Sequence, residues 1–592
     1  MIDDLFEHVP RDSYTNTSKF ADDGAVWVRH RELSKIQAQL REALDGVEQW
    51  CGKWGFTISP EKTVGVVFKR KGCRVSHTPC LKLKGKEVKF EKSAKFLGVT
   101  FDQHLTWAKH IDNITQSCQK DLNAMRAVSG SSWGANSETL LTLYKSLIRS
   151  KIDYVCEAYH SASQSALSRL ENIQYQALKL VTGAATCTSH QALLVETGEL
   201  PLHLRREKLT LNYWSRCSNP LVTRLWEEKL YSGRTKARPN TTPGGLRVIQ
   251  LRREHGCDQV EPPTQPMTVQ CPPWRLRSPN VDTTLTNEPP KSVNPMLLRV
   301  RALSRIATVY EDSAYIYTDG SKDPVRNRTA YGILIHTATS NHTISARLPD
   351  GQSVYTAELE AIHHALRYCR NLHEKRVVIL SESLSAIQSL ATKHSSSRPD
   401  TIHEILVLIQ KLRQENEKEV TLCWIPSHVG IPGNERADKL ARQALELNVS
   451  LEHPYSKSEI RSMIQNSITS KWQMLWDTSD KGYIRWLHQF RPSVKGKLLG
   501  PSQNRRVDIM ITRLRLGTTK TSYKDCPTCH TKATVSHIML DCQRFDTIRQ
   551  TLKEETKLDT LTAKQLLAHT EHHSMYKLLA NFLLDSELCQ YI

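Results

Sequence analysis

Carboxylates recur between residues 315 and 445 at positions where a carboxylate is costly to place. Asp319 follows the apolar run Ala314–Tyr317 and precedes a glycine and a serine, so we expect a strand that delivers an acid to a turn. Glu382 follows the apolar run Val377–Leu380, which again puts a carboxylate at the end of a buried strand. Because an unpaired buried charge is strongly unfavourable, each of these acids needs a partner.

Two further acids lie on predicted helices of the same segment. Glu358 belongs to AELEAIHHALRYC, where apolar residues follow it at helical spacing and put it on the apolar face, whereas Glu360 points away. Asp438 begins another amphipathic segment, in which Ala441 and Leu445 share its side of the helix. We therefore expect four acids from separate elements to converge on one place.

Such a cluster of acids predicts a metal site. Four carboxylates packed together cannot all remain ionised without a positive charge among them, and hard oxygen ligands suit Mg2+ or Mn2+. The arrangement favours a two-metal phosphodiester hydrolase, whose ions stand roughly 3.5 to 4 Å apart and activate water and stabilise the leaving oxygen. His428, in the loop SHVGIPGN, could move protons or help the product to leave.

The segment resembles type 1 ribonuclease H. The resemblance is carried by four blocks in the family's order and spacing, which are TDGS at Thr318–Ser321, AELEAI at Ala357–Ile362, SLSA at Ser383–Ala386 and SHVGIPGNERADKLA at Ser427–Ala441. It implies cleavage of the RNA strand of an RNA/DNA hybrid. The catalytic set that it implies is Asp319, Glu358, Glu382, His428 and Asp438, in which the four acids would hold Mg2+ or Mn2+.

One position departs from the family pattern, which has an aspartate before SxxA where this chain has Glu382. The charge is kept, but the extra methylene moves it by over roughly an ångström, and a misplacement of that size can cost on the order of 100-fold in rate. We therefore expect a weakened site. Taken singly, each acid is also typical of a solvated surface charge or a helix cap, and Asp319 before Gly320 fits an ordinary turn.

The order of elements predicts the fold of residues 310–446. Strands are expected at YIYTDG, AYGILIHT, HTISARL, RVVILS and VTLCWIP, and helices at VYTAELEAIHHALRYC, LSAIQSLA, IHEILVLIQKLRQE and NERADKLARQAL. This is a ribonuclease H-like mixed five-stranded sheet with helices on its faces, and its acids would meet over the sheet centre. The whole chain is expected to be α/β and multidomain, since 592 residues correspond to roughly four domains.

The net charge favours a polyanionic partner. The chain carries a formal charge of +20 and no run of about 18 apolar residues, so we expect an RNA/DNA hybrid, RNA and DNA as partners, and no membrane. The N-terminus MIDDLFEHVP lacks a secretory or transit pattern, so we expect an intracellular protein, in the nucleus or the cytoplasm. The 15 cysteines, mostly single within apolar runs, indicate reduced core residues and not a disulfide framework.

The N-terminal block SKFADDGAVWVRH puts Asp22 and Asp23 at the tip of a predicted hairpin. Adjacent carboxylates there are suited to hold Mg2+ under a nucleoside triphosphate, although Asp-Asp-Gly alone also fits ordinary turn chemistry. An amphipathic helix is predicted at residues 32–50. WGFTISPEKT with Lys62 and KFLGVTFDQHLTW at Lys95–Trp107 follow it.

This series resembles the C-terminal half of the reverse transcriptase palm of Jockey-like non-LTR retrotransposons. The resemblance makes residues 1–107 a partial α+β palm, with Lys62 as the palm lysine and Asp22 and Asp23 as remnants of the polymerase metal site. The sequence before Phe20 is too short for the fingers and for the third metal-binding aspartate. Polymerase activity is therefore not expected of this chain.

Three further regions are predicted. Residues 108–230 show helical periodicity with Gly183 as a C-cap, and are a thumb and connection by resemblance or otherwise a plain helical packing module. Residues 231–300 are a Pro-rich basic linker, which cannot bury enough apolar area to offset its ordering entropy. Residues 455–592 are predicted to be helical, and their tryptophans either pack inward or stack on unpaired bases.

The C-terminal region carries a CCHC motif, CPTCHTKATVSHIMLDC. Three thiolates and an imidazole at these spacings can close tetrahedrally around Zn2+, and a structural site is favoured because all four positions are filled. The motif resembles the small zinc motif that ends many elements of this kind, and His530 is a competing ligand. The four predicted ligands are Cys526, Cys529, His537 and Cys542.

Taken together, the sequence predicts an N-terminally truncated retrotransposon polyprotein whose activity is that of a metal-dependent ribonuclease H. The first alternative is a catalytically weakened remnant that binds nucleic acid. The second is an RNA-directed DNA polymerase, if sequence upstream of Met1 is missing.

Overall fold

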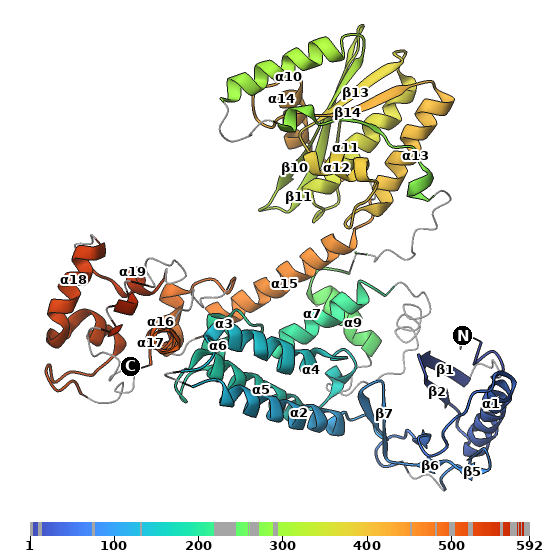
Figure 1. Ribbon diagram of the computed structural model, residues 1–592, viewed down its shortest axis with the longest axis vertical. Helices are drawn as coiled ribbons and strands as arrows, with labels where there is room; N and C mark the ends of the chain where they lie inside the picture. Colours follow the sequence, from blue (N-terminus) through green and yellow to red (C-terminus); the bar gives the residue numbers. More distant parts are fainter. Residues whose placement is uncertain are drawn as a thin grey trace. The chain divides into compact units, whose positions relative to one another are not determined.

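The structure is a computed structural model of the chain, which divides into two compact units (Figure 1). One unit comprises residues 1–210, 232–247 and 469–592, and the other comprises residues 211–231 and 248–468. The described residues are 4–9, 15–73, 77–130, 133–217, 244–258, 260, 272–287, 294–449, 453–479, 482–496, 504–518, 525–556, 560–568, 577, 579–581 and 583–584.

The second unit is built on one mixed sheet, whose strands stand in the order β12, β11, β10, β13, β14, β9. The first three are antiparallel neighbours, whereas β10, β13, β14 and β9 are parallel neighbours. The bounds are β9 Asn280–Asp282, β10 Ala314–Asp323, β11 Arg328–His336, β12 Asn341–Leu348, β13 Arg376–Ser381 and β14 Glu419–Trp424.

The sheet has six strands, one more than the five expected. Residues 280–282, which were expected to belong to the linker, form β9 and pair with residues 421–423 of β14. The pairing satisfies backbone groups that an edge strand would leave open. Asp282 fixes the added strand, because its carboxylate accepts hydrogen bonds from Arg305 Nε at 2.8 Å and from the Tyr310 hydroxyl at 2.6 Å.

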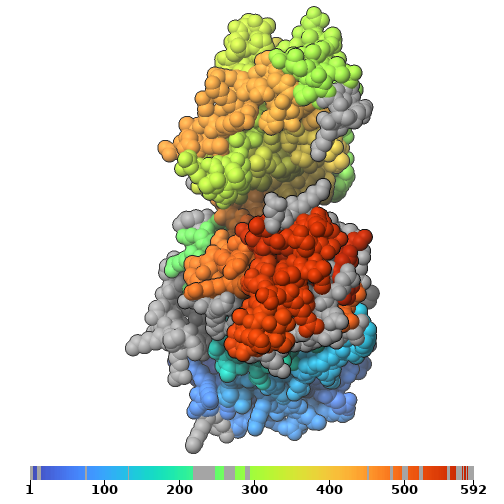
Figure 2. All heavy atoms as spheres, turned by 90° about the vertical axis from the view of Figure 1, so that its left-hand side faces the viewer, coloured from blue at the N-terminus to red at the C-terminus, as the bar shows by residue number. Residues whose placement is uncertain are grey.

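Helices cover both faces of this sheet (Figure 1). Successive strand residues point to opposite faces, so Ile316 joins one core with α11, α12 and α13, whereas Tyr317 joins another with α10 and α14. In Figure 2 the lime, yellow and light-orange residues of this sheet and its helices gather into a compact body. The bounds are α10 Pro295–Val309, α11 Val354–Tyr368, α12 Leu384–Thr392, α13 Pro399–Glu415 and α14 Pro432–Ala444.

The first unit begins with the predicted hairpin of β1 Thr15–Phe20 and β2 Asp23–Val28, in which Phe20 pairs with Asp23. Helix α1, Leu33–Trp54, packs Trp50 against Val26 of the hairpin in a small core. Short strands follow, which are β3 Val64–Gly65, β4 Lys82–Leu83, β5 Lys86–Glu87, β6 Lys89–Phe90, β7 Ser93–Phe96 and β8 Val99–Asp102.

The predicted helical region begins at residue 108. Helix α5 shows why the sequence folds this way, because the Ser163 side chain accepts a hydrogen bond from Ala166 N and Gly183 ends the helix at φ 63°. The predicted C-cap at Gly183 is thus confirmed. The bounds are α2 Ala108–Ala127, α3 Ser137–Leu143, the π-helix η1 Tyr144–Arg149, α4 Ser150–Asp153, η2 Tyr159–Ser161, α5 Gln164–Thr182, α6 His190–Thr197 and α7 Leu202–Trp214.

The Pro-rich segment 231–300 is folded wherever it is described. It contains α9 Gly244–Glu254, η3 Pro273–Arg275, β9, η4 Thr284–Asn287 and the first turns of α10. The remaining parts of the predicted linker, residues 231–243, 259, 261–271 and 288–293, lie outside the described residues.

The C-terminal region is helical, as predicted, and two of its tryptophans point inward. Trp472 is 6% exposed and Trp476 is 2% exposed, both on α15. None of the described helices is both long and apolar enough to cross a bilayer. The bounds are α15 Lys457–Asp477, α16 Gly482–Phe490, α17 Arg505–Arg515, the π-helix η6 His537–Asp541, η7 Gln543–Phe545, α18 Asp546–Thr556 and α19 Ala563–Leu567.

Candidate functional site

Asp319 lies inside β10 and not at its end. The strand pairs with β13 only as far as Thr318, opposite Ser381, and then continues against β11 to Asp323. The predicted turn after Asp319 is therefore wrong, because β11 supplies hydrogen-bond partners for the backbone that follows. Asp319 is buried, at 3% exposed, beside the point where β13 ends.

Glu382 follows β13 directly, as predicted, and two side chains from other elements contact it. Its backbone carbonyl accepts a hydrogen bond from Trp424 Nε1 at 3.0 Å, and its Oε2 accepts one from Asn434 Nδ2 at 3.1 Å. Asn434 lies in the first turn of α14 and is buried. The carboxylate of Glu382 is therefore tied to the helix that carries Asp438.

Helix α11 brings Glu358 to the strand that carries Asp319. Ser353 caps the helix, with its side chain accepting a hydrogen bond from Thr356 N at 3.1 Å. The helix runs close to β10, since a Cβ on Gly320 would lie 3.0 Å from the Glu358 backbone nitrogen. Glu358 is 5% exposed as a result of this approach.

Helix α14 approaches β11 in the same manner. A Cβ on Gly332 would lie only 2.4 Å from the Ala437 carbonyl oxygen and 2.5 Å from the Ala441 nitrogen, so only glycine fits there. Asp438 lies on this helix, and its Oδ2 pairs with Arg442 Nη2 at 2.8 Å. Arg442 is mostly exposed, so the ion pair stands at the rim of the site.

Asp319 interacts electrostatically with each of the three other acids. Burial raises the pKa of Asp319 to about 8, together with the negative charges of Glu382 and Asp438. Burial also raises the pKa of Glu358 well above its ordinary value, and the charges of Asp319 and Glu382 act in the same direction. Among the described residues, Glu358 Oε2 is buried without a hydrogen-bond partner. A bound cation would reduce the repulsion among the acids and would give Glu358 Oε2 a partner.

Glu360 corrects one expectation. It points away from Glu358 but it is not solvated, because it is 8% exposed and its Oε1 lies 2.8 Å from His453 Nε2. Burial alone would raise the pKa of Glu360, but hydrogen bonds from His363 and His453 hold it well below its ordinary value. Periodicity could not detect this burial, since the covering residue comes from beyond the predicted domain boundary.

His428 lies in the loop between β14 and α14, where its φ of 52° is in the left-handed region and Gly430 follows at 84°. The side chain is exposed. It is therefore open to solvent, as a group that exchanges protons must be.

Three residues that position the acids were not predicted, which are Asn434, Gly320 and Gly332. Gly320 lies within TDGS and Asn434 within SHVGIPGNERADKLA, so a sequence signal existed for both. Gly332 stood inside a predicted strand, where an isolated glycine often marks a close backbone approach.

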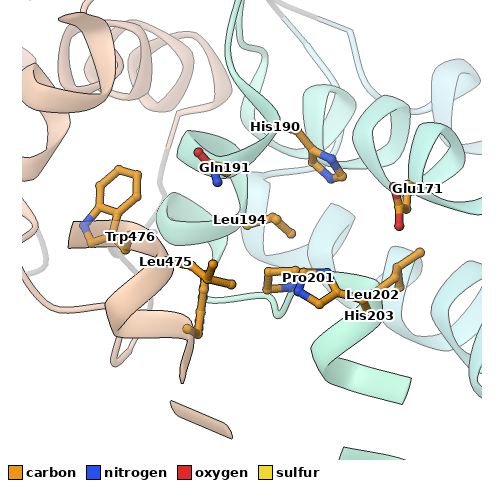
Figure 3. Close-up of a pocket in the computed structure, with 10 residues that line it drawn as sticks. Glu171, His190, Gln191, Leu194, Pro201, Leu202, His203, Leu475 and Trp476 are labelled. Atoms are coloured by element: carbon orange, nitrogen blue, oxygen red, sulfur yellow. The ribbon is translucent and has the colours of Figure 1, made fainter. Parts of the chain in front are cut away.

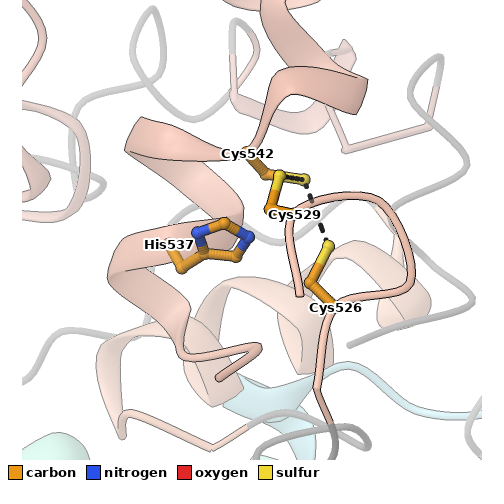
Figure 4. Close-up of side chains that lie close together, drawn as sticks. All are labelled: Cys526, Cys529, His537 and Cys542. Carbon is orange, nitrogen blue, oxygen red and sulfur yellow. Dashed lines mark hydrogen bonds between the residues drawn. The ribbon is translucent and has the colours of Figure 1, made fainter. Parts of the chain in front are cut away.

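The CCHC residues come together in the C-terminal core (Figure 4). One ligand atom from each of Cys526, Cys529, His537 and Cys542 lies within 4.8 Å of the others. Cys542 Sγ lies 3.7 Å from Cys526 Sγ and 3.9 Å from Cys529 Sγ. A tetrahedral site with Zn–S bonds of about 2.3 Å has sulfurs about 3.8 Å apart, so the spacing fits Zn2+.

The chemistry of this donor set also fits a metal. Burial would raise the pKa of the Cys526 thiol, but interactions with the His537 side chain and with the backbone of Cys529 and Thr528 lower it to about 6. His537 Nε2 is buried without a hydrogen-bond partner among the described residues. His530, which was predicted as a competing ligand, is exposed and does not belong to the cluster of Cys526, Cys529, His537 and Cys542 among the described residues.

The predicted polymerase remnants lie on the surface of the first unit. Asp22 and Asp23 are exposed at the tip of the β1–β2 hairpin, and Ala21 takes a φ of 51° in its turn. Lys62 is exposed as well.

A cavity of about 190 Å3, which the sequence did not predict, lies among α5, α6, α7 and α15 in the first unit (Figure 3). His190 and His203 line it together with Leu475 and Trp476. Burial lowers the pKa of His190 to about 4, so its imidazole is neutral near pH 7. Glu171 and Gln191 also line the cavity, which therefore combines apolar side chains with polar groups.

Comparison with known families and structures adds to this geometry. Residues 311–446 match the family model described as RNase H. Among solved structures, an RNase H1 from Halobacterium salinarum NRC-1 is 18% identical, and LC11-RNase H1 in complex with an RNA/DNA hybrid is 24% identical. Each match covers 23% of this chain, with 98% and 97% of the respective solved chain and a TM-score of 0.19 in both.

Relatives among characterised proteins come from retrotransposons. The RNA-directed DNA polymerase from mobile element jockey of Drosophila melanogaster is 28% identical over 165 residues, which are 28% of this chain and 18% of the relative. A retrovirus-related Pol polyprotein from type-1 retrotransposable element R1 4 of Nasonia vitripennis is 27% identical over 198 residues, 31% of this chain and 50% of the relative. The matches therefore span half or less of these relatives' length.

Proposed function

We propose, from the premise that residues 311–446 are an RNase H domain, that this chain hydrolyses the RNA strand of RNA/DNA hybrids with a divalent cation. One observation carries the proposal most directly. Asp319 is buried and interacts with Glu382 and Asp438, and Glu358 interacts with Asp319 and Glu382, so burial and like charge raise the pKa of Asp319 to about 8.

The four acids fit Mg2+ or Mn2+. Oxygen donors are the ligands that these cations prefer, and Glu358 Oε2 is buried without a hydrogen-bond partner among the described residues, so a cation would supply the missing positive charge. When bound, a divalent cation lowers the pKa of water and stabilises charge on the leaving oxygen. The formal net charge of +20 favours a polyanionic substrate.

Other residues of the chain would position the acids and exchange protons. Asn434 holds the Glu382 carboxylate through its 3.1 Å hydrogen bond, and Arg442 bounds the site beside Asp438. His428, exposed on the loop that leads into α14, would exchange protons with solvent at its imidazole nitrogens during product release.

A labelled RNA/DNA hybrid incubated with the full chain tests this proposal. We expect Mg2+-dependent cleavage of the RNA strand by the wild type and loss of cleavage in Asp319→Asn. Equal cleavage by the two proteins, or cleavage that EDTA does not stop, would contradict the proposed site.

A second candidate function is hybrid binding with weak cleavage, which Glu382 favours because the related family has aspartate there. If the longer side chain misplaces the charge, Glu382→Asp should raise cleavage by up to about 100-fold. Unchanged cleavage would mean that the hydrogen bond from Asn434 accommodates the glutamate. Hybrid affinity, measured without divalent cation, should be the same in both proteins.

We also propose that Cys526, Cys529, His537 and Cys542 hold a structural Zn2+. The sulfur separations of 3.7 and 3.9 Å support it, and so does His537 Nε2, which is buried without a hydrogen-bond partner in the part of the chain that the structure describes. All four positions are filled by protein ligands, which leaves no place for a reacting molecule and favours a structural role.

A further inference from the structure

Glu459 lies on α15, outside the residues that match the RNase H model, yet it contacts the helix that carries Glu358. Its Oε1 accepts hydrogen bonds from the Ser353 backbone nitrogen at 2.8 Å and from the Thr356 hydroxyl at 2.6 Å. Ser353 is the N-cap of α11, so a full negative charge stands at the N-terminus of this helix. An anion at that position stabilises the helix dipole and satisfies an amide that the helix leaves open.

Glu459 is itself held firmly. It is 3% exposed, and its Oε2 accepts a hydrogen bond from Ser456 N at 2.8 Å, while Ser456 Oγ accepts one from Glu459 N at 3.2 Å. This reciprocal pair is a capping box at the start of α15. The buried guanidinium of Arg398 lies 3.8 Å from Glu459 Oε2 and balances part of its charge.

The same segment contacts α11 at a second point. His453 Nε2 lies 2.8 Å from Glu360 Oε1, and the backbone carbonyl of His453 accepts a hydrogen bond from Gln352 Nε2 at 3.0 Å. Arg398 donates to the Pro454 carbonyl at 3.0 Å and thereby fixes the segment from α13. Residues 453–459 therefore hold α11 both at its first turn and one turn further along.

The side chain held by this arrangement is Glu358, which follows Thr356 by two residues and has a buried oxygen without a partner among the described residues. The Glu358 carboxyl group interacts with the Gly320 amide and with Asp319, but its Oε2 has no partner among the described residues, so the first turn of α11 helps to set the position of this oxygen. A carboxylate that orients a metal ligand through other groups typically changes metal affinity or activity 10- to 100-fold when it is removed.

We propose that Glu459 is a positioning residue for Glu358, so that the divalent-cation site extends in function beyond residues 311–446 into the first turn of α15. The inference rests on the proposed metal-binding role of Glu358. It assigns to Glu459 no contact with substrate or cation.

The test measures Mg2+ binding to the full chain by calorimetry, without nucleic acid, beside the melting temperature. Glu459→Gln removes the charge at nearly constant shape, and Thr356→Val removes the hydroxyl that donates to it. We expect both to raise the Mg2+ dissociation constant by about 10- to 100-fold. Thr356→Ser, which keeps the hydroxyl, and Glu415→Gln, at the exposed end of α13, should bind Mg2+ as the wild type does.

A role limited to folding would lower the melting temperature and leave the dissociation constant unchanged. That result in both Glu459→Gln and Thr356→Val would overturn the proposal. If Glu459→Gln does not fold, the result for Thr356→Val alone decides. Cleavage of a labelled hybrid is measured separately. If the wild type and variants differ in Mg2+ binding as expected but the wild type does not cleave, the positioning role is supported and the proposed function is overturned.

Discussion

Gly332 is the register partner of Asp319 in the β10–β11 pair, and helix α14 packs directly on it. A Cβ at this position would lie 2.4 Å from the Ala437 carbonyl oxygen, so Gly332→Ala must displace α14 and with it Asp438. We expect a loss of about 1 to 3 kcal/mol in the free energy of unfolding. Hybrid cleavage should fall by about 100-fold, since the displacement approaches an ångström.

Thermal unfolding and cleavage assays check this prediction. Gly52→Ala is the matched control, because a Cβ there meets nothing within 4 Å. If the Gly332→Ala variant has the stability and cleavage rate of the wild type, the position of α14 does not depend on this contact.

The buried acids predict that stability without Mg2+ falls as pH rises. Burial and like charge raise the pKa of Asp319 to about 8 in the folded chain, whereas an unfolded aspartate titrates near 3.9. Between these values the folded protein binds more protons than the unfolded protein, so the stabilisation present at low pH is lost as pH approaches about 8.

Melting temperatures measured from pH 5 to 8 in Mg2+-free buffer check this. Asp319→Asn should flatten the pH dependence, and added Mg2+ should stabilise the wild type most at the high-pH end. Asp312→Asn, whose side chain is 77% exposed, should retain the wild-type slope. A wild-type melting temperature that rises from pH 5 to pH 8 would contradict this prediction.

Asn434 should be needed for cleavage although it is not one of the acids. Its Nδ2 donates to Glu382 Oε2 at 3.1 Å, and its loss would free the carboxylate to take other rotamers. We expect Asn434→Ala to lower cleavage by about 10- to 100-fold and to weaken Mg2+ binding. The double variant Asn434→Ala with Glu382→Gln should be little worse than Glu382→Gln alone, since both changes remove the same interaction. Additive losses would show that Asn434 acts elsewhere.

His537, which belongs to the CCHC cluster, and His530, which does not, should differ in their effect on metal retention. His537→Asn removes a ligand of the CCHC cluster and should abolish zinc retention, measured by elemental analysis of the purified chain, and lower the melting temperature. His530→Asn should keep about one zinc per chain, because His530 is exposed and takes a φ of 54° that asparagine tolerates. Loss of zinc in His530→Asn with retention in His537→Asn would reverse the ligand assignment.

Local patterns were sufficient to predict a large part of the second unit. The alternation of apolar residues located the strands and the apolar face of α11, so the burial of Glu358 could be predicted from the residues around it. The wrong turn after Asp319 has a definite cause. Gly320 and Ser321 are turn residues in isolation, but pairing with β11 keeps them extended.

The sequence alone determined which elements carry the acids and which four residues form the CCHC cluster, because periodicity and short spacings are local properties. The tertiary structure alone decided that β9 joins the sheet, that Glu360 is buried under His453 and that Glu459 caps α11. Each of these depends on two segments far apart in the chain meeting at hydrogen-bonding distance. Such contacts follow from the packing of whole elements, and no short stretch of sequence specifies them.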